Sequence, residues 1–267
     1  MKKLILIVTS IFLMSNLSGQ ECEYEEYFRL TDLAKKEFSE QNFNGAKRNF
    51  QLAFAKTDIP LGHDLSYALV TANETKDNEW AEHVAEKLAK GGTPLRYFAK
   101  FKKKKWYNKF KSNFELHAKY YVDHFNIEMR NRFLEISQDD YEFTNKYHQW
   151  RERKIELTLQ ELIDGATKIL TDFKDFNEKY GFPNEQHMGY NYVRHKNRIE
   201  PYHVDVIMIH SNQWGVLTYE DKIHDLVCTG GIHPSFEKSL KGIRGYGNST
   251  GVEQEMQARY AKYRGTK

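Results

Sequence analysis

Apolar residues recur every three or four positions between residues 155 and 176, and this is the strongest periodicity in the chain. The recurring residues are Ile155, Leu159, Leu162, Ile163, Ala166, Ile169, Leu170, Phe173 and Phe176. This spacing places them on one face of an α-helix, so we predict a helix of roughly seven turns that is the spine of a helical domain. The helix is predicted to end at residues 180–183, because Gly181 can adopt the left-handed conformation that terminates a helix and Pro183 cannot continue one.

A second helical pattern occupies the N-terminal third of the chain. Its first copy comprises Leu30, Leu33, Ala34, Phe43, Ala46, Phe50 and Ala53, and its second copy comprises Ala68, Ala81, Ala85 and Leu88, with Pro94 at the end. Small residues where two helices touch, with large residues filling the gaps, resemble the tetratricopeptide repeat over about residues 24 to 95. The resemblance implies two stacked helical hairpins, although Glu37 stands where that family usually has a large apolar residue. An ordinary helical bundle is the alternative that the same spacing allows.

Basic and aromatic residues are interleaved in the next segment, residues 95–114. Its aromatic residues are Tyr97, Phe98, Phe101, Trp106, Tyr107, Phe110 and Phe114. Such a mixture can bind single-stranded nucleic acid or an anionic membrane surface. The aromatic residues fall near helical spacing, however, so we predict that they pack as a third hairpin over the repeats while the lysines stay in solvent. The near balance of 40 Lys and Arg against 37 Asp and Glu likewise argues against a dedicated nucleic-acid binder.

The rest of the chain is predicted to form a second helical domain, so that the fold is all-α. Predicted helices outside the spine cover residues 126–137, 204–209, 219–227 and 234–241, with a frayed helix after Met256. The helix at 204–209 is favoured over a strand because Pro201 suits a first helical turn. Residues 184–199 show little regular pattern, and four glycines mark residues 242–251 as a loop. The predicted domains are residues 1–19, 20–118 and 119–267.

A second resemblance covers about residues 126–251. The residues that carry it are Tyr180 to Pro183, Gly189, His203 and Asp205, Ile209 and His210, and the late Gly245, Tyr246 and Gly247. They resemble an uncharacterised bacterial domain that often follows tetratricopeptide-like segments in exported proteins. That domain also has an upstream Asp-Gln pair followed by Arg, whereas this chain has Asp139, Asp140 and Tyr141, with Arg151 farther on. The family has no established activity, so the resemblance implies a domain and no mechanism.

Residues 1–19 are typical of a secretory signal peptide. Lys2 and Lys3 precede an apolar run from Leu4 to Met14, and small residues follow before Gln20. The apolar run has about ten residues whereas a bilayer crossing needs about twenty, so a retained anchor is the weaker alternative. With cleavage before Gln20, the mature protein is expected to be soluble, periplasmic or secreted, and without an integral membrane segment.

The two cysteines of the chain are Cys22 and Cys228. Cys22 lies beyond Gln20 and Glu21, so it does not directly follow the small residues as a lipidated cysteine would. In an oxidising compartment the two cysteines either pair or remain two free thiols, and their spacing does not decide between these states.

Histidines concentrate in one part of the chain: six of the eleven lie between His187 and His233. Imidazole and carboxylate groups act as acids and bases in hydrolysis and bind metals such as zinc, so His203, Asp205 and His210 are the candidate catalytic residues. His187 or Asp140 is expected to join them from a neighbouring segment. On a helix, His203 and His210 lie about 10 Å apart along the axis, too far for easy chelation of one ion through bonds of about 2 Å. We therefore assign no metal and no cofactor, and histidines buried for structural reasons are the alternative.

Two functions fit these observations. The first is an exported interaction protein whose helical repeats bind a protein or peptide partner through a concave surface. The second is a periplasmic or secreted hydrolase, possibly metal-dependent, that uses the His and Asp residues of the C-terminal domain. The sequence favours the first, because it contains no recognisable nucleophile motif, no close pair of metal ligands and no phosphate-binding glycine loop.

Overall fold

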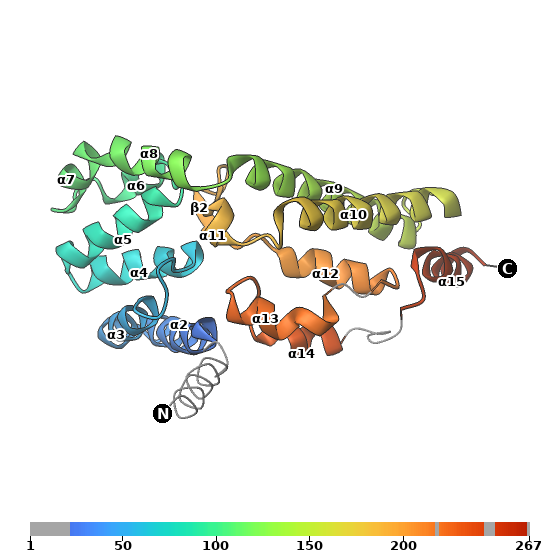
Figure 1. Ribbon diagram of the computed structural model, residues 1–267, viewed down its shortest axis with the longest axis horizontal. Coiled ribbons are helices and arrows are strands. Elements are labelled where there is room, and N and C mark those ends of the chain that lie inside the picture. The colour runs from blue at the N-terminus through green and yellow to red at the C-terminus, as the bar shows by residue number, and fades with distance from the viewer. Residues whose placement is uncertain (1–21, 217–218, 243–248, 266–267) are drawn as a thin grey trace, which may run out of the picture.

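The computed structural model describes residues 22–216, 219–242 and 249–265, and in these ranges the chain is all-α apart from one short hairpin (Figure 1). The predicted signal peptide lies outside the described residues, as do Gly245, Tyr246 and Gly247 of the second resemblance. No described helix is both long and apolar enough to cross a membrane.

The elements fall into an N-terminal and a C-terminal group. The first group is α2 (Glu23–Ser39), α3 (Phe43–Phe54), α4 (Gly62–Glu74), α5 (Asn78–Lys90), α6 (Leu95–Phe98), η1 (Ala99–Phe101), α7 (Tyr107–Ser112) and α8 (Phe114–His124). The second group is α9 (Ile127–Arg151), α10 (Leu159–Tyr180), α11 (Glu185–Met188), β1 (Asn191–Val193), β2 (Arg198–Glu200), α12 (Val204–Gln213), η2 (Glu220–Lys222), α13 (Ile223–Cys228), α14 (Ser235–Lys241) and α15 (Val252–Arg264). The strands β1 and β2 pair antiparallel, with Tyr192 opposite Ile199.

Helices α2 to α5 form two successive pairs, α2 with α3 and α4 with α5. The small residues that were expected at the helix contacts, Ala34, Ala46, Ala53, Ala68, Ala81 and Ala85, are fully buried. Leu33 is 39% exposed, so its predicted place in the repeat core is wrong. The paired helices agree with the all-α prediction, and membership of the tetratricopeptide family stays a prediction.

The interleaved aromatic and basic segment folds as η1 and the short helices α6, α7 and α8 against this first group. All seven of its aromatic side chains are buried, while Lys102 to Lys105 are exposed. Trp106 also donates a hydrogen bond from Nε1 to Oδ1 of Asn73 at 3.1 Å, which ties the segment to α4. The prediction that the aromatic residues pack over the helical pairs is confirmed, and these rings are therefore not free to stack on nucleic-acid bases.

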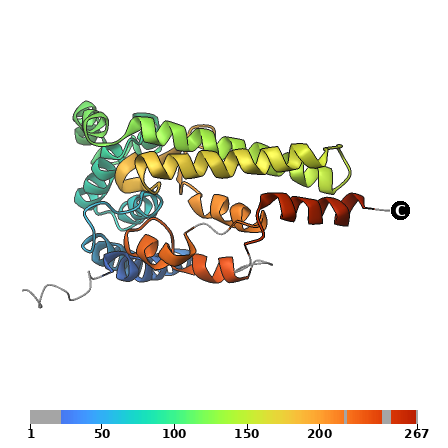
Figure 2. The ribbon, with the colours of Figure 1, turned by 45° about the vertical axis from the view of Figure 1, so that its right-hand side comes forward.

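The spine of the second group is a hairpin of two long helices, α9 and α10, rather than one (Figure 2). The predicted helix at 126–137 is too short, because α9 continues through residues 139 and 140 to Arg151. Its buried stripe runs on from Phe133 and Ile136 through Asp140 to Phe143 and Tyr147. The start of the second helix also differs: α10 begins at Leu159, after Thr158 and Glu161 form a reciprocal capping box, and Ile155 precedes it.

Three smaller expectations need correction. Residues 184–199, expected to be irregular, contain α11 and the hairpin of β1 and β2, and α12 begins at Val204, so Pro201 precedes its first turn. The tail is a docked helix rather than a frayed one, since Met256 of α15 is fully buried. Arg259 fixes α15 in place by donating to the Gln213 carbonyl at 2.6 Å and to the Tyr147 hydroxyl at 2.8 Å.

The two groups interlock. Tyr24, Tyr27 and Phe28 of α2 belong to the same core as Ile207 of α12 and Leu226 of α13. The Cys22–Cys228 disulfide joins the start of α2 to the end of α13, with 4.5 Å between the two Cα atoms. The predicted domains 20–118 and 119–267 are thus connected by a shared core and by a covalent bond.

Tyr190 makes the reciprocal connection from the second group into the first. Its ring fills the space beside Gly62 and Gly91, where a Cβ would come within 2.6 Å and 2.2 Å of it. The Tyr190 amide donates to the Gly91 carbonyl at 2.7 Å, and its hydroxyl donates to the Pro60 carbonyl at 3.0 Å. These contacts hold α11 and the hairpin between the two groups, and the cavities described below lie around this junction.

Candidate active site

Helices α9 and α12 bring Asp140 and His210 into direct contact. Both carboxylate oxygens of Asp140 lie 2.9 Å from Nδ1 of His210, and the hydroxyl of Thr144 lies 3.3 Å from the same nitrogen. The Asp140 side chain is 5% exposed and that of His210 is 16% exposed. Asp140 faces inward because Ile136 and Phe143, which belong to the buried stripe of α9, lie four positions before it and three after it.

The contact with Asp140 sets the state of the His210 ring. A carboxylate accepts hydrogen bonds, so Nδ1 carries the proton, and Nε2 is left with a free lone pair in the neutral ring. The ring also stacks on Trp214, with 5.6 Å between the ring centroids and 28° between the planes. Asp140 and Trp214 therefore hold the imidazole in one orientation, which is what a general base requires.

A cleft of about 500 Å³ opens beside this pair. Its polar lining includes Ser137, Asp140, Thr144, His148, His203 and His210. The Ser137 hydroxyl oxygen is buried from solvent and has no hydrogen-bond partner among the described residues. Burial lowers the pKa of His148, and the nearby charge of Arg151 lowers it further, so His148 is neutral at pH 7.

The structure distributes the predicted site residues over two hollows. His203 and His210 both line the cleft, as the hydrolase hypothesis requires, while Asp205 faces a neighbouring cavity. No described contact joins His203 to Asp205, and the partner of His210 is instead Asp140, which had been named as a residue from a neighbouring segment. His187 is exposed and lines neither hollow.

Three residues of the cleft were missed from sequence: Ser137, Thr144 and His148. Together with Asp140 they are spaced by three, four and four residues, so they lie along one face of α9. This pattern was readable only if residues 127–151 were recognised as a continuous helix. The assumed break after residue 137 concealed it.

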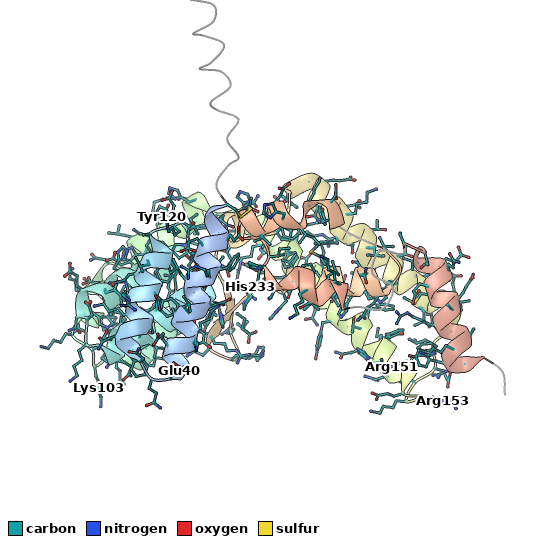
Figure 3. The ribbon with its side chains drawn as sticks, turned by 90° about the horizontal axis from the view of Figure 1, so that it is seen from below. Glu40, Lys103, Tyr120, Arg151, Arg153 and His233 are labelled. Carbon is teal, nitrogen blue, oxygen red and sulfur yellow. A yellow bond between two sulfur atoms is a disulfide. The ribbon has the colours of Figure 1, made fainter. Side chains whose placement is uncertain are left out.

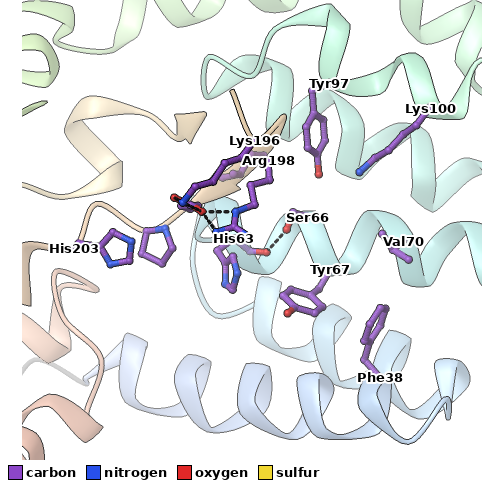
Figure 4. Close-up of a pocket in the computed structure, with 13 residues that line it drawn as sticks. Phe38, His63, Ser66, Tyr67, Val70, Tyr97, Lys100, Lys196, Arg198 and His203 are labelled. Atoms are coloured by element: carbon purple, nitrogen blue, oxygen red, sulfur yellow. Dashed lines mark hydrogen bonds and ion pairs between the residues drawn. The ribbon is translucent and has the colours of Figure 1, made fainter. Parts of the chain in front are cut away.

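His203 occupies a central position among the hollows of the molecule. It precedes α12 in the left-handed conformation, with φ of 47°, and its side chain is exposed. Besides the cleft, it lines a cavity of about 350 Å³ and a groove of about 510 Å³. Figure 4 shows the groove, with Tyr97 and Lys100 on one side and Tyr67 and Phe38 on the other.

Among the described residues, one group places three potential metal-ligand atoms within 4.8 Å of one another; it is formed by Cys22, His224 and Cys228. Its two sulfur atoms are joined in the disulfide, and the group lies apart from the cleft residues. His203 and His210 do not belong to any such group within the described ranges.

The chain was compared with protein-family models, with curated proteins and with solved structures, and none of the three comparisons finds a match.

Proposed function

We propose that this protein is a hydrolase in which His210 is the general base and Asp140 orients it. The observation that carries the proposal is the contact of both Asp140 oxygens with Nδ1 at 2.9 Å, at the wall of a cleft of about 500 Å³. A buried carboxylate beside an imidazole at the wall of a cleft is the arrangement that activates water or a hydroxyl in many hydrolases.

The proposed reaction is hydrolysis of an ester, amide or phosphoester bond. Nε2 of His210 takes a proton from a water molecule while the water oxygen attacks the carbonyl carbon or phosphorus. The bond to the leaving group then breaks, and the proton on Nε2 passes to the leaving group. Asp140 stabilises the imidazolium that exists between these two transfers.

The proposed location is periplasmic or secreted. The signal-peptide pattern of residues 1–19 supports it, and the Cys22–Cys228 disulfide supports it independently, because disulfides form and persist in oxidising compartments.

A second candidate function, partner binding by the helical pairs, is favoured by the groove of about 510 Å³. Its walls carry the aromatic rings of Phe38, Tyr67 and Tyr97. The ammonium of Lys100 lies over the Tyr97 ring, 4.6 Å from its centroid, and has no ion-pair partner among the described residues. Aromatic rings beside a free cation suit an extended peptide with aromatic and acidic side chains.

The second candidate predicts that Lys100→Glu weakens binding of such peptides at least tenfold, because the charge that meets their carboxylates is reversed. The measurement is selection of peptides from a displayed library on the wild-type protein, followed by fluorescence titration of the selected peptides with each variant. Lys103→Glu is the matched control, because this substitution reverses the same charge at a different place. Lys103 is exposed at the outer end of the first group (Figure 3). Equal losses in both variants would show that the effect is general electrostatics and not the groove.

The hydrolase proposal predicts that His210→Asn lowers turnover at least about 100-fold, the usual contribution of a general base. The asparagine amide can still donate to Asp140 in place of Nδ1, so the variant loses Nε2 while keeping the buried contact. The assays use p-nitrophenyl acetate, p-nitrophenyl phosphate and bis-p-nitrophenyl phosphate, which cover the three bond classes by absorbance. His195→Asn is the control, because His195 is exposed in the turn between β1 and β2.

The proposal is contradicted if the wild-type protein hydrolyses none of the three substrates faster than buffer does. It is also contradicted if His210→Asn and wild type turn over a substrate at the same rate.

A further inference from the structure

A cavity of about 350 Å³, separate from the cleft, lies where α2, α4, α11 and the start of α12 meet. Its ionisable lining is Lys35, His63, Asp64, Glu185, Tyr202, His203, Asp205 and His233. Phe28, Leu61 and Ile232 provide an apolar wall. The proposed hydrolysis uses none of these groups, so the cavity needs its own explanation.

Glu185 is the least satisfied of these groups. It is buried, and its Oε2 accepts a hydrogen bond from the Gly62 amide at 2.6 Å. This is the one hydrogen bond of the Glu185 carboxyl group within the described part of the chain. No described cation contacts the carboxyl. Burial raises its pKa to about 8, and the negative charge of Asp64 adds to the increase, while the Gly62 amide opposes it.

The cations nearest the cavity are already engaged. The Lys35 ammonium lies 3.2 Å from Asp64 and 3.3 Å from Asp32, and Tyr27 also donates to Asp64 at 2.8 Å. Burial lowers the pKa of His63, which leaves that ring neutral at pH 7. Nε2 of His233 lies 3.2 Å from Asp32, and no described contact joins His233 to the Glu185 carboxyl.

The balance of charge in the cavity is therefore acidic when Glu185 is ionised. Three carboxyl groups, Asp64, Asp205 and Glu185, face it, with one ammonium group to balance them. A buried carboxylate without a cation is costly, and an ammonium brought by a ligand would remove that cost.

We propose that this cavity binds a small molecule that carries a primary ammonium group. The ammonium ion pairs with the Glu185 carboxylate, and the carbon skeleton packs on Phe28, Leu61 and Ile232. Because Glu185 is protonated before the ligand arrives, its proton leaves to solvent as the ion pair forms. Binding of a positively charged amine is thus coupled to the release of up to one proton.

The test is a paired panel of small primary amines and of alcohols with the same carbon skeletons, screened on the full-length protein by ligand-observed NMR. Amines that bind are then titrated by calorimetry at pH 7 in two buffers with different ionisation enthalpies, which measures proton release. The variant is Glu185→Gln, which keeps an acceptor for the Gly62 amide and cannot ionise. Glu178→Gln is the matched control, because the Glu178 side chain is 66% exposed on α10.

We expect amines to bind and their alcohol partners not to bind, with release of between half and one proton per amine. Glu185→Gln should abolish the release and weaken amine binding at least tenfold, while Glu178→Gln should leave both unchanged. Thermal unfolding at pH 6 verifies that Glu185→Gln is folded. The proposal is overturned if amines bind no more often than alcohols, or if Glu185→Gln binds amines as tightly as wild type.

Discussion

Replacement of both Cys22 and Cys228 by serine is expected to lower the free energy of unfolding by about 3–5 kcal/mol. The disulfide closes a loop with a sequence separation of 206 residues, and a long loop loses much conformational entropy in the unfolded chain when it is closed. The bond also holds α2 against α13, where Tyr24 and Phe28 share a core with Leu226. Equilibrium unfolding in guanidinium chloride measures the difference.

The control for this experiment is chemical reduction. Wild-type protein treated with dithiothreitol should unfold at the same denaturant concentration as the double serine variant, and the variant itself should not respond to the reductant. Equal stability of the oxidised wild type and the double variant would show that non-covalent packing holds the two groups together without a contribution from the disulfide.

Replacement of Glu185 by glutamine is expected to make the protein more stable, by an amount that grows with pH. The carboxyl has a folded-state pKa of about 8 against an ordinary value of 4.5, so between these values the folded state holds a proton that the unfolded state has released. Wild-type stability must therefore fall as pH rises from about 5 to about 8, at up to about 1.4 kcal/mol per pH unit. Because glutamine does not ionise, the Glu185→Gln variant does not lose this stability as the pH rises.

The measurement is denaturant unfolding of both proteins at pH 5, 7 and 9. The two curves should lie close together at pH 5, and the glutamine variant should be several kcal/mol more stable at pH 9. Glu178→Gln, which removes an exposed carboxylate, should follow the wild-type profile at every pH. Parallel profiles for wild type and Glu185→Gln would mean that Glu185 is ionised in the folded protein at neutral pH, and that binding of an amine would release no proton.

Helical structure was predictable from sequence wherever one face of a helix is buried in apolar residues. The spine at α10, the helix α12 and the aromatic residues of α6 to α8 were all placed correctly, because their burial follows the helical period. The fixed pitch of the backbone makes that period visible in a short stretch of sequence.

Prediction failed where a polar residue takes an inward position. Asp140 interrupts the apolar stripe of α9, and the predicted helix covers only residues 126–137. Helix α9 nevertheless continues to Arg151, and Nδ1 of His210 donates to the buried Asp140 carboxylate. The partner lies 70 residues away in the chain. No window around Asp140 contains it, so neither the continuous helix nor the direct pairing of Asp140 with His210 could be predicted from the local sequence.

The sequence by itself determined that this chain is helical, which faces of most helices are buried, and that histidines and acids gather in its C-terminal half. Only the tertiary structure decided that Asp140 contacts His210, that Cys22 joins Cys228, and that Glu185 is buried without a cation. The reason is physical: helix pitch is set by hydrogen bonds between residues four apart, so it leaves a local pattern. Pairing and burial of polar groups depend on how distant segments pack, and that packing leaves no local pattern.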